Sequence, residues 1–153
     1  NSSWTGNITL NTNSSIGSFG AGVTFDLSGV IDGAGTFTKV GDGILILSGA
    51  NTYTSSTTVN GGILRVGTAN ERIPDSSAVT LANTAGVALD LNGFAETIAS
   101  LTGGGTTSGN VTTSGGTLNI GGTATTTFDG DVSGGGNLTY RRRLAHRGDE
   151  LDS

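Results

Sequence analysis

The sequence predicts an all-β solenoid, and three observations carry that prediction. Short runs such as 44–47 and 63–66 alternate in the period of two that is typical of a strand with one buried face. Apolar residues recur at nearly constant intervals, with Leu27 and Leu47 twenty positions apart and Leu47 and Val66 nineteen apart. Glycine or a polar turn closes each run. A repeat near twenty residues, with one or two short strands in each, is solenoid spacing.

The elements can be placed in order along the chain. Before residue 33, two pairs of apolar residues, Ile8 with Leu10 and Phe25 with Leu27, indicate the first coils. After residue 67, alternation stops over residues 68–77, where acidic residues, arginine and the sole proline gather. Proline lacks the donor that a central strand needs, so this segment is expected to bulge out as a loop and to be the best place in the core for a contact site.

The later strands repeat earlier ones. Alternation resumes at Val79 and continues through residues 87–91, where Asp90 is expected to face outward. Residues 115–121 repeat residues 61–67 at an offset of 54, and residues 128–139 repeat residues 25–38 with the earlier copy two residues longer. The predicted core is an inward-facing set of aliphatic side chains: Leu27, Leu45, Leu47, Leu64, Val66, Leu89, Leu91, Leu118 and Ile120.

The segment 33–67 carries a family signature. It contains Lys39, Gly41 and Gly43, then Leu45 and Leu47, the run 48–54 (Ser-Gly-Ala-Asn-Thr-Tyr-Thr), the run 57–62 (Thr-Thr-Val-Asn-Gly-Gly) and Leu64. This pattern resembles the autotransporter passenger-associated β-strand repeat, except that Ser55 and Ser56 stand where the family has two glycines. Residues 87–103 are similar to a second common passenger segment.

The resemblance implies a fold and a role. It implies a right-handed single-stranded parallel β-helix of six to seven coils over residues 1–139, serving as a stem or passenger fragment of a bacterial autotransporter. Such a rod would support adhesion or host-surface interaction, at the cell surface, associated with the outer membrane, or extracellular. The rest of the autotransporter chain, including the membrane-embedded translocator barrel and the export signal, is then expected outside these 153 residues, and a host surface protein or glycan is the expected partner.

Composition excludes several classes of function. The chain has no cysteine, so it has no disulfide and no thiolate metal site. Its net charge is −5, and residues 1–140 hold only Lys39, Arg65 and Arg72 against nine acids, which argues against nucleic acid and anionic lipid as partners. No apolar run reaches transmembrane length, so direct membrane insertion is not expected.

No catalytic residue, cofactor or metal ligand is predicted. Asp129 and Asp131 form the nearest carboxylate pair, and alternation would place both on one face. A β-helix enzyme that cleaves acidic polysaccharide would need more carboxylates and a nearby cation. That enzyme class stays open as an alternative. The simpler interpretation is that Asp129 and Asp131 are acidic residues in turns, exposed to solvent.

The composition changes abruptly at the end of the chain. Residues 140–153 hold four of the seven basic residues and the sole histidine, and they interrupt a recognisable repeat. This predicts a disordered tail that is a frameshifted, truncated or otherwise foreign end. Within it, Arg147, Gly148 and Asp149 form the tripeptide that integrins read in adhesive proteins, which gives a second alternative, an integrin-type adhesion module. Self-association through unpaired strand edges at open coil ends is also expected.

Overall fold

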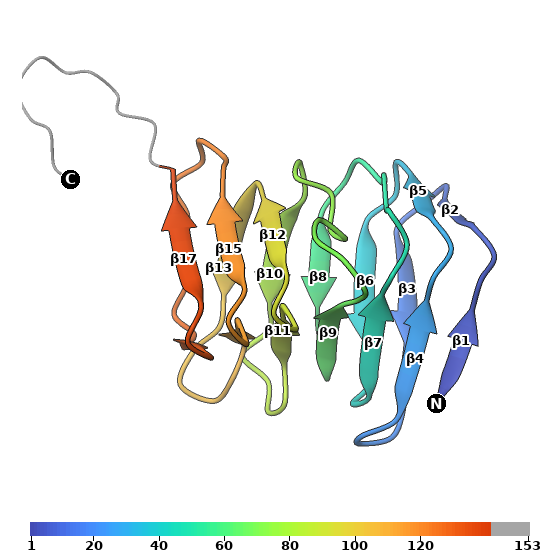
Figure 1. Cartoon of the computed structure of the whole chain (residues 1–153), viewed down its shortest axis with the longest axis horizontal. Coiled ribbons are helices and arrows are strands. Elements are labelled where there is room, and N and C mark those ends of the chain that lie inside the picture. The colour runs from blue at the N-terminus through green and yellow to red at the C-terminus, as the bar shows by residue number, and fades with distance from the viewer. Residues whose placement is uncertain (142–153) are drawn as a thin grey trace, which may run out of the picture.

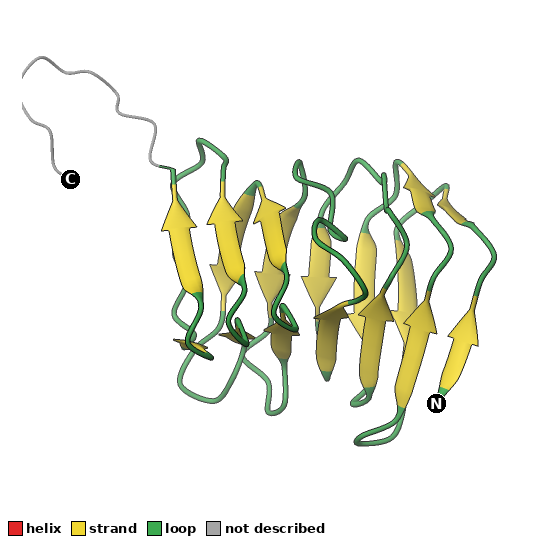
Figure 2. Cartoon of the chain, viewed as in Figure 1, coloured by secondary structure: helices red, strands yellow, loops and turns green. Residues whose placement is uncertain are grey.

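The computed structural model describes residues 1–141, and this part of the chain contains strands and no helix (Figure 2). Seventeen short strands wind into a stack of about six turns, with the first and last strands at opposite ends of the stack (Figure 1). Within residues 1–141 every strand pairing is parallel, and each joins one coil to the next. The fold is the parallel β-helix that the sequence predicts.

One face of the stack is a seven-stranded sheet, to which each coil contributes one strand. In spatial order it contains β1 (Ser2–Trp4), β4 (Thr24–Leu27), β7 (Ile44–Leu47), β9 (Ile63–Val66), β11 (Ala88–Asp90), β14 (Asn110–Thr112) and β16 (Val132–Ser133). The predicted intervals are the observed ones, since Leu27 pairs with Leu47 and Leu47 with Val66.

A second face is a five-stranded sheet. Its strands are β13 (Ser100–Gly103), β10 (Ala78–Leu81), β8 (Thr57–Val59), β6 (Phe37–Val40) and β3 (Ser14–Gly17). An isolated parallel bridge between Gly103 and Phe128 adds one more rung. Each coil therefore supplies a strand to this face as well.

The third face is interrupted in the middle of the stack. One part of it pairs β2 (Ile8–Leu10) with β5 (Ile31–Gly33), and the other joins β12 (Ala95–Ile98), β15 (Thr117–Ile120) and β17 (Asn137–Tyr140). Between them, residues 51–54 and 70–73 follow the same path without forming strands. A coil thus has three strand positions, not the one or two that the sequence indicates.

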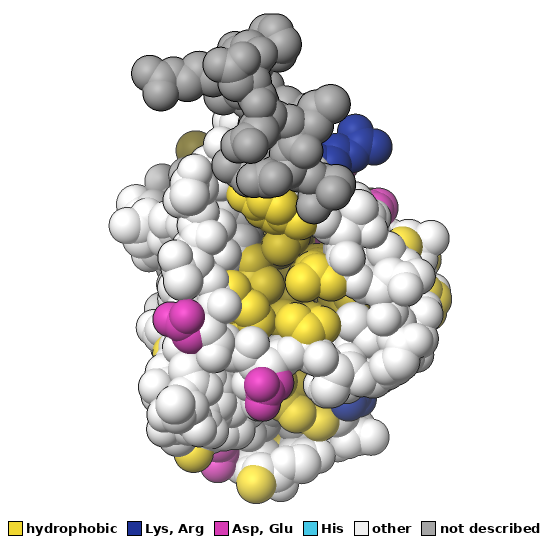
Figure 3. Space-filling view, turned by 90° about the vertical axis from the view of Figure 1, so that its left-hand side faces the viewer, with side chains coloured by type: hydrophobic (Ala, Val, Ile, Leu, Met, Phe, Trp, Pro, Cys, Tyr) yellow, Lys and Arg dark blue, Asp and Glu magenta, His cyan; other side chains and the backbone are white. Residues whose placement is uncertain are grey.

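The core is a strip of aliphatic side chains that runs through the inside of all the coils. The nine predicted core residues are all buried, each with 7% of its surface exposed or less. Phe37, Tyr53 and Ile73 are among the other buried core residues, and the Phe37 and Tyr53 rings pack with their centroids 5.7 Å apart. Seen from the β17 end, this apolar strip lies within a ring of polar surface (Figure 3).

Sequence repeats do not keep their face in the coil. Residues 61–67 and 115–121 are similar in sequence, yet β9 lies in the seven-stranded sheet and β15 in the three-stranded one. The copy of β4 at Phe128 also lies on a different face, beside Gly103 of the five-stranded sheet. The repeated unit is therefore a strand with its turn, and the coil is assembled from three such units.

Candidate functional site

Residues 68–77, the loop that the sequence singles out, lie against the stack. Asn70 and Glu71 both reach the next coil: Asn70 Oδ1 accepts the Ala95 N–H at 2.9 Å, and the Glu71 N–H donates to the Ala95 carbonyl at 3.0 Å. Ile73 is 1% exposed and belongs to the core. The expectation of a loop bulging from the coil is wrong, because side chains give this irregular backbone the hydrogen bonds that a strand would have made.

Two side chains from neighbouring coils hold this segment. Asn51 Oδ1 accepts the Ile31 N–H at 2.8 Å, and Asn51 Nδ2 donates to the Arg72 carbonyl at 2.8 Å. From the other side, the Glu96 carboxyl accepts the N–H groups of Arg72 and Ile73 at 3.0 and 2.8 Å. The interrupted third face is thus bridged by an amide and a carboxyl in place of a backbone ladder.

Glu96 is buried, with 0% of its surface exposed, and occupies an inward-facing position of β12. Burial raises the pKa of Glu96 to about 8, against the two backbone N–H donors that lower it. Sequence analysis missed this residue, although a signal was present. Glu96 alternates with Ile98, so the period of two that places Ile98 in the core places Glu96 there too.

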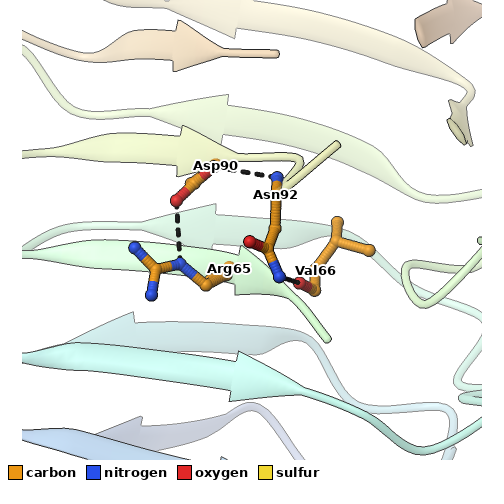
Figure 4. Close-up of polar contacts among 4 residues, drawn as sticks. All are labelled: Arg65, Val66, Asp90 and Asn92. Atoms are coloured by element: carbon orange, nitrogen blue, oxygen red, sulfur yellow. Dashed lines mark hydrogen bonds and ion pairs between the residues drawn. The ribbon is translucent and has the colours of Figure 1, made fainter. Parts of the chain in front are cut away.

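The outer face of the seven-stranded sheet carries a charged contact between two coils (Figure 4). Arg65 Nε lies 2.8 Å from Asp90 Oδ2, and Asp90 Oδ1 accepts the Asn92 N–H at 2.8 Å. Asn92 Nδ2 in turn donates to the Val66 carbonyl at 3.3 Å. Asp90 faces outward as predicted, and this contact ties β9 to the turn after β11.

The most exposed large apolar side chain in the described residues lies on the turn between β3 and β4. Phe19 is 71% exposed and Val23 44% exposed. Gly20 and Gly22 have φ values of 102° and 79°, which glycine adopts readily, and the Gly20 N–H donates to Asp42 Oδ1 at 2.6 Å. This turn therefore presents an aromatic side chain to solvent, on the side of the rod.

The other predicted residues are placed as follows. Asp129 and Asp131 are both exposed and lie outside any strand, and their N–H groups bond to the Gly103 carbonyl and to Asn110 Oδ1. Residues 1–141 contain no group of three or more histidine, cysteine or acidic residues that could hold a metal ion. Arg147, Gly148 and Asp149 lie outside the described residues, so the tripeptide is not tested.

No helix within residues 1–141 is long and apolar enough to cross a membrane.

Comparison with known proteins identifies the signature region. Residues 37–66, from β6 through β9, match the model of the passenger-associated-transport-repeat family. Over 91 residues, which is 60% of this chain, the sequence is 45% identical to the adhesin BmaC autotransporter of Brucella suis biovar 1 (strain 1330). The chain spans only 3% of the length of that protein. No solved structure matches the chain.

Proposed function

Because the chain carries a passenger-associated transport repeat, we propose that it is a segment of the exported passenger of a bacterial autotransporter and supports adhesion. The observation that carries the proposal is the 45% identity to a segment of an adhesin, combined with a stack of coils whose hydrogen bonds run along the axis. Each coil adds about 4.8 Å along that axis. A stack of this kind is a stiff spacer that can hold contact surfaces away from a cell.

The partners and location follow from the same proposal. The rest of the autotransporter chain is the covalent partner, and the segment works at the bacterial surface, associated with the outer membrane or extracellular. A host surface protein or glycan is the ligand class, and the role is binding without catalysis. The similarity to an adhesin gives no support to cleavage of polysaccharide through Asp129 and Asp131.

We place the contact on the turn between β3 and β4. Phe19 has the highest exposed fraction of the aromatic side chains in the described residues, and aromatic side chains supply much of the binding energy at protein interfaces. Residues 68–77 are less suitable for this, because their backbone and side chains are engaged with the next coil.

Attachment of coated beads to cultured mammalian cells tests the proposal. Beads that carry the full chain should attach above beads that carry albumin, and Phe19→Ser should reduce attachment several-fold. Thr80→Ser, on the outer face of the five-stranded sheet, is the control and should attach like the original chain. Attachment no greater than that of albumin would contradict the adhesive role, and attachment unaffected by Phe19→Ser would contradict the placement.

The tripeptide at Arg147, Gly148 and Asp149 stays a separate proposal for the same assay. Integrin-type recognition needs a carboxylate at a fixed distance from the arginine, so Asp149→Glu should abolish any attachment that depends on it. Unchanged attachment of Asp149→Glu would remove this adhesion mode.

A further inference from the structure

The junction between residues 70–73 and β12 is held by two carboxyl side chains. On the other two faces, the same two coils are joined by parallel backbone pairing, between β9 and β11 and between β10 and β13. At this junction the described backbone supplies one hydrogen bond, from the Glu71 N–H to the Ala95 carbonyl. The N–H groups of Arg72, Ile73, Ala95 and Thr97 donate to side chains instead.

The two carboxyls act reciprocally. Glu71, in the irregular segment, accepts the Thr97 N–H at 2.8 Å and the Thr97 hydroxyl at 3.1 Å. Glu96, in β12, accepts the N–H groups of Arg72 and Ile73. Each coil therefore caps the backbone amides of the other, and we call Glu71, Arg72, Ile73, Glu96 and Thr97 the carboxyl clasp.

Burial first, and nearby acidic groups second, make the ionisation of Glu96 costly. Glu71 and Asp75 both face it from the irregular segment and raise its pKa, and Tyr53 faces it from the preceding coil. On β15 its register partner is Leu118, which is buried and cannot share a charge. Within residues 1–141, Arg72 forms no ion pair with these carboxyls. An ionised Glu96 would thus be a buried anion facing other anions.

We propose that the carboxyl clasp is a proton-controlled seam of the solenoid, closed while Glu96 holds a proton and locally open when Glu96 ionises. Opening lets water reach the carboxylate and frees the amides of Arg72 and Ile73. It stays confined to the third face, because β9 with β11 and β10 with β13 remain paired on the other two faces. This device does not depend on the adhesive role.

The direction of the effect follows from proton linkage. The closed clasp holds the proton of Glu96 up to about pH 8, whereas an open, hydrated glutamate has the ordinary pKa of 4.5. Below pH 4.5 the protonated Glu96 contributes its full stabilisation to the closed form. That stabilisation falls as the pH rises from 4.5 towards 8. In that window the opening constant grows by roughly tenfold for each pH unit.

Carbon-13 NMR of the full chain with labelled glutamate carboxyls is a direct test, because the chain contains only Glu71, Glu96 and Glu150. Assignment of the Glu96 signal follows from its disappearance in Glu96→Gln. We expect the Glu96 signal to titrate with a midpoint well above its ordinary value of 4.5 and no higher than about 8, because opening stabilises the ionised form. A midpoint near its ordinary value of 4.5 would overturn the proposal.

Amide hydrogen exchange tests the opening itself. Protection factors, which are corrected for intrinsic exchange, should fall with rising pH at Arg72, Ile73 and Thr97, and stay constant at Leu89 in the seven-stranded sheet. Glu96→Gln, which cannot ionise, should lose the pH dependence, and Asp129→Asn should keep it. Constant protection at the clasp of the original chain, or unchanged pH dependence in a folded Glu96→Gln, would overturn the proposal. If Glu96→Gln does not fold, the proposal is tested by the amide protection factors and the Glu96 titration of the original chain.

Discussion

Lys39 shows how a single residue can link two turns from inside the coil. It is fully buried on the inward phase of β6, and its Nζ donates to the carbonyls of Val40, Gly41 and Gly61 at 2.9, 2.7 and 2.9 Å. Burial lowers the pKa of Lys39 to about 8, with the nearby Asp42 opposing that shift. Three carbonyls at the corner of neighbouring coils therefore depend on one amine.

Replacing Lys39 by methionine should lower the free energy of unfolding. The substitution keeps much of the apolar stem but leaves three carbonyls without this donor, and we expect a loss of roughly 3 kcal/mol. Urea denaturation followed by circular dichroism would measure it. Arg65→Met is the matched control, because it removes a partly exposed ion pair that contributes less than about 1 kcal/mol. Equal losses in the two variants would contradict the role given to Lys39.

The same residues mark what sequence could and could not predict at this scale. Alternation correctly placed the inward leucines and the outward Asp90. It left Lys39 and Glu96 without a role, because charged residues are rarely fully buried unless they are paired. Their partners are backbone groups up to 24 positions away, and only the assembled coils bring these together.

At the scale of the element, glycine sets how closely successive turns approach. A Cβ on Gly49 would overlap the backbone oxygen of Gly29, in the preceding coil. A Cβ on Gly29 would in turn overlap the backbone oxygen of Gly6, one coil closer to the N-terminus. These three glycines thus form a column in which backbone lies against backbone. A side chain in this column would force the neighbouring coil to move.

Gly49→Ala should destabilise the stack, whereas Gly121→Ala should not. The overlap of the Gly49 Cβ with backbone cannot be relieved by turning a side chain, so we expect a loss of about 1–3 kcal/mol. A Cβ on Gly121 has Thr97 Cγ2 as its nearest contact, at 3.8 Å, and the change should stay within about 0.5 kcal/mol. Thermal melts of both variants would measure the difference, and a similar melting temperature for the two would count against the close approach.

Strand positions could be predicted from the sequence where residues alternate regularly. They could not be predicted where side chains replace the backbone hydrogen bonds between coils. The predicted positions of β7 and β9 agree with the structure, where leucine or valine at every second position is buried in both strands. Residues 68–77 were expected to project from the coil because they lack that phase and contain Pro74. Their attachment depends on Asn70 and Glu71 of the segment and on Glu96 of the next coil, and no local pattern reveals such pairing.

At the scale of the whole molecule, the two ends of the described stack differ from its sides. Trp4 of β1, and Val132, Leu138 and Tyr140 at the other end, are 39–53% exposed, although most strand apolar residues between them are buried. Within residues 1–141, β1 and β17 each pair on one side only. Apolar surface and free backbone groups therefore coincide at both ends.

We expect copies of the chain to associate through these ends. Stacking of one end coil on another would continue the parallel pairing and cover the apolar strip that Figure 3 shows at the β17 end. In sedimentation equilibrium the average mass should rise with concentration, and Leu138→Lys should suppress that rise by placing a charge at the end. Val23→Lys is the control, because Val23 is 44% exposed against 47% for Leu138 but lies on the side of the rod. A monomer at all concentrations, or equal suppression by both variants, would show that the ends do not drive association.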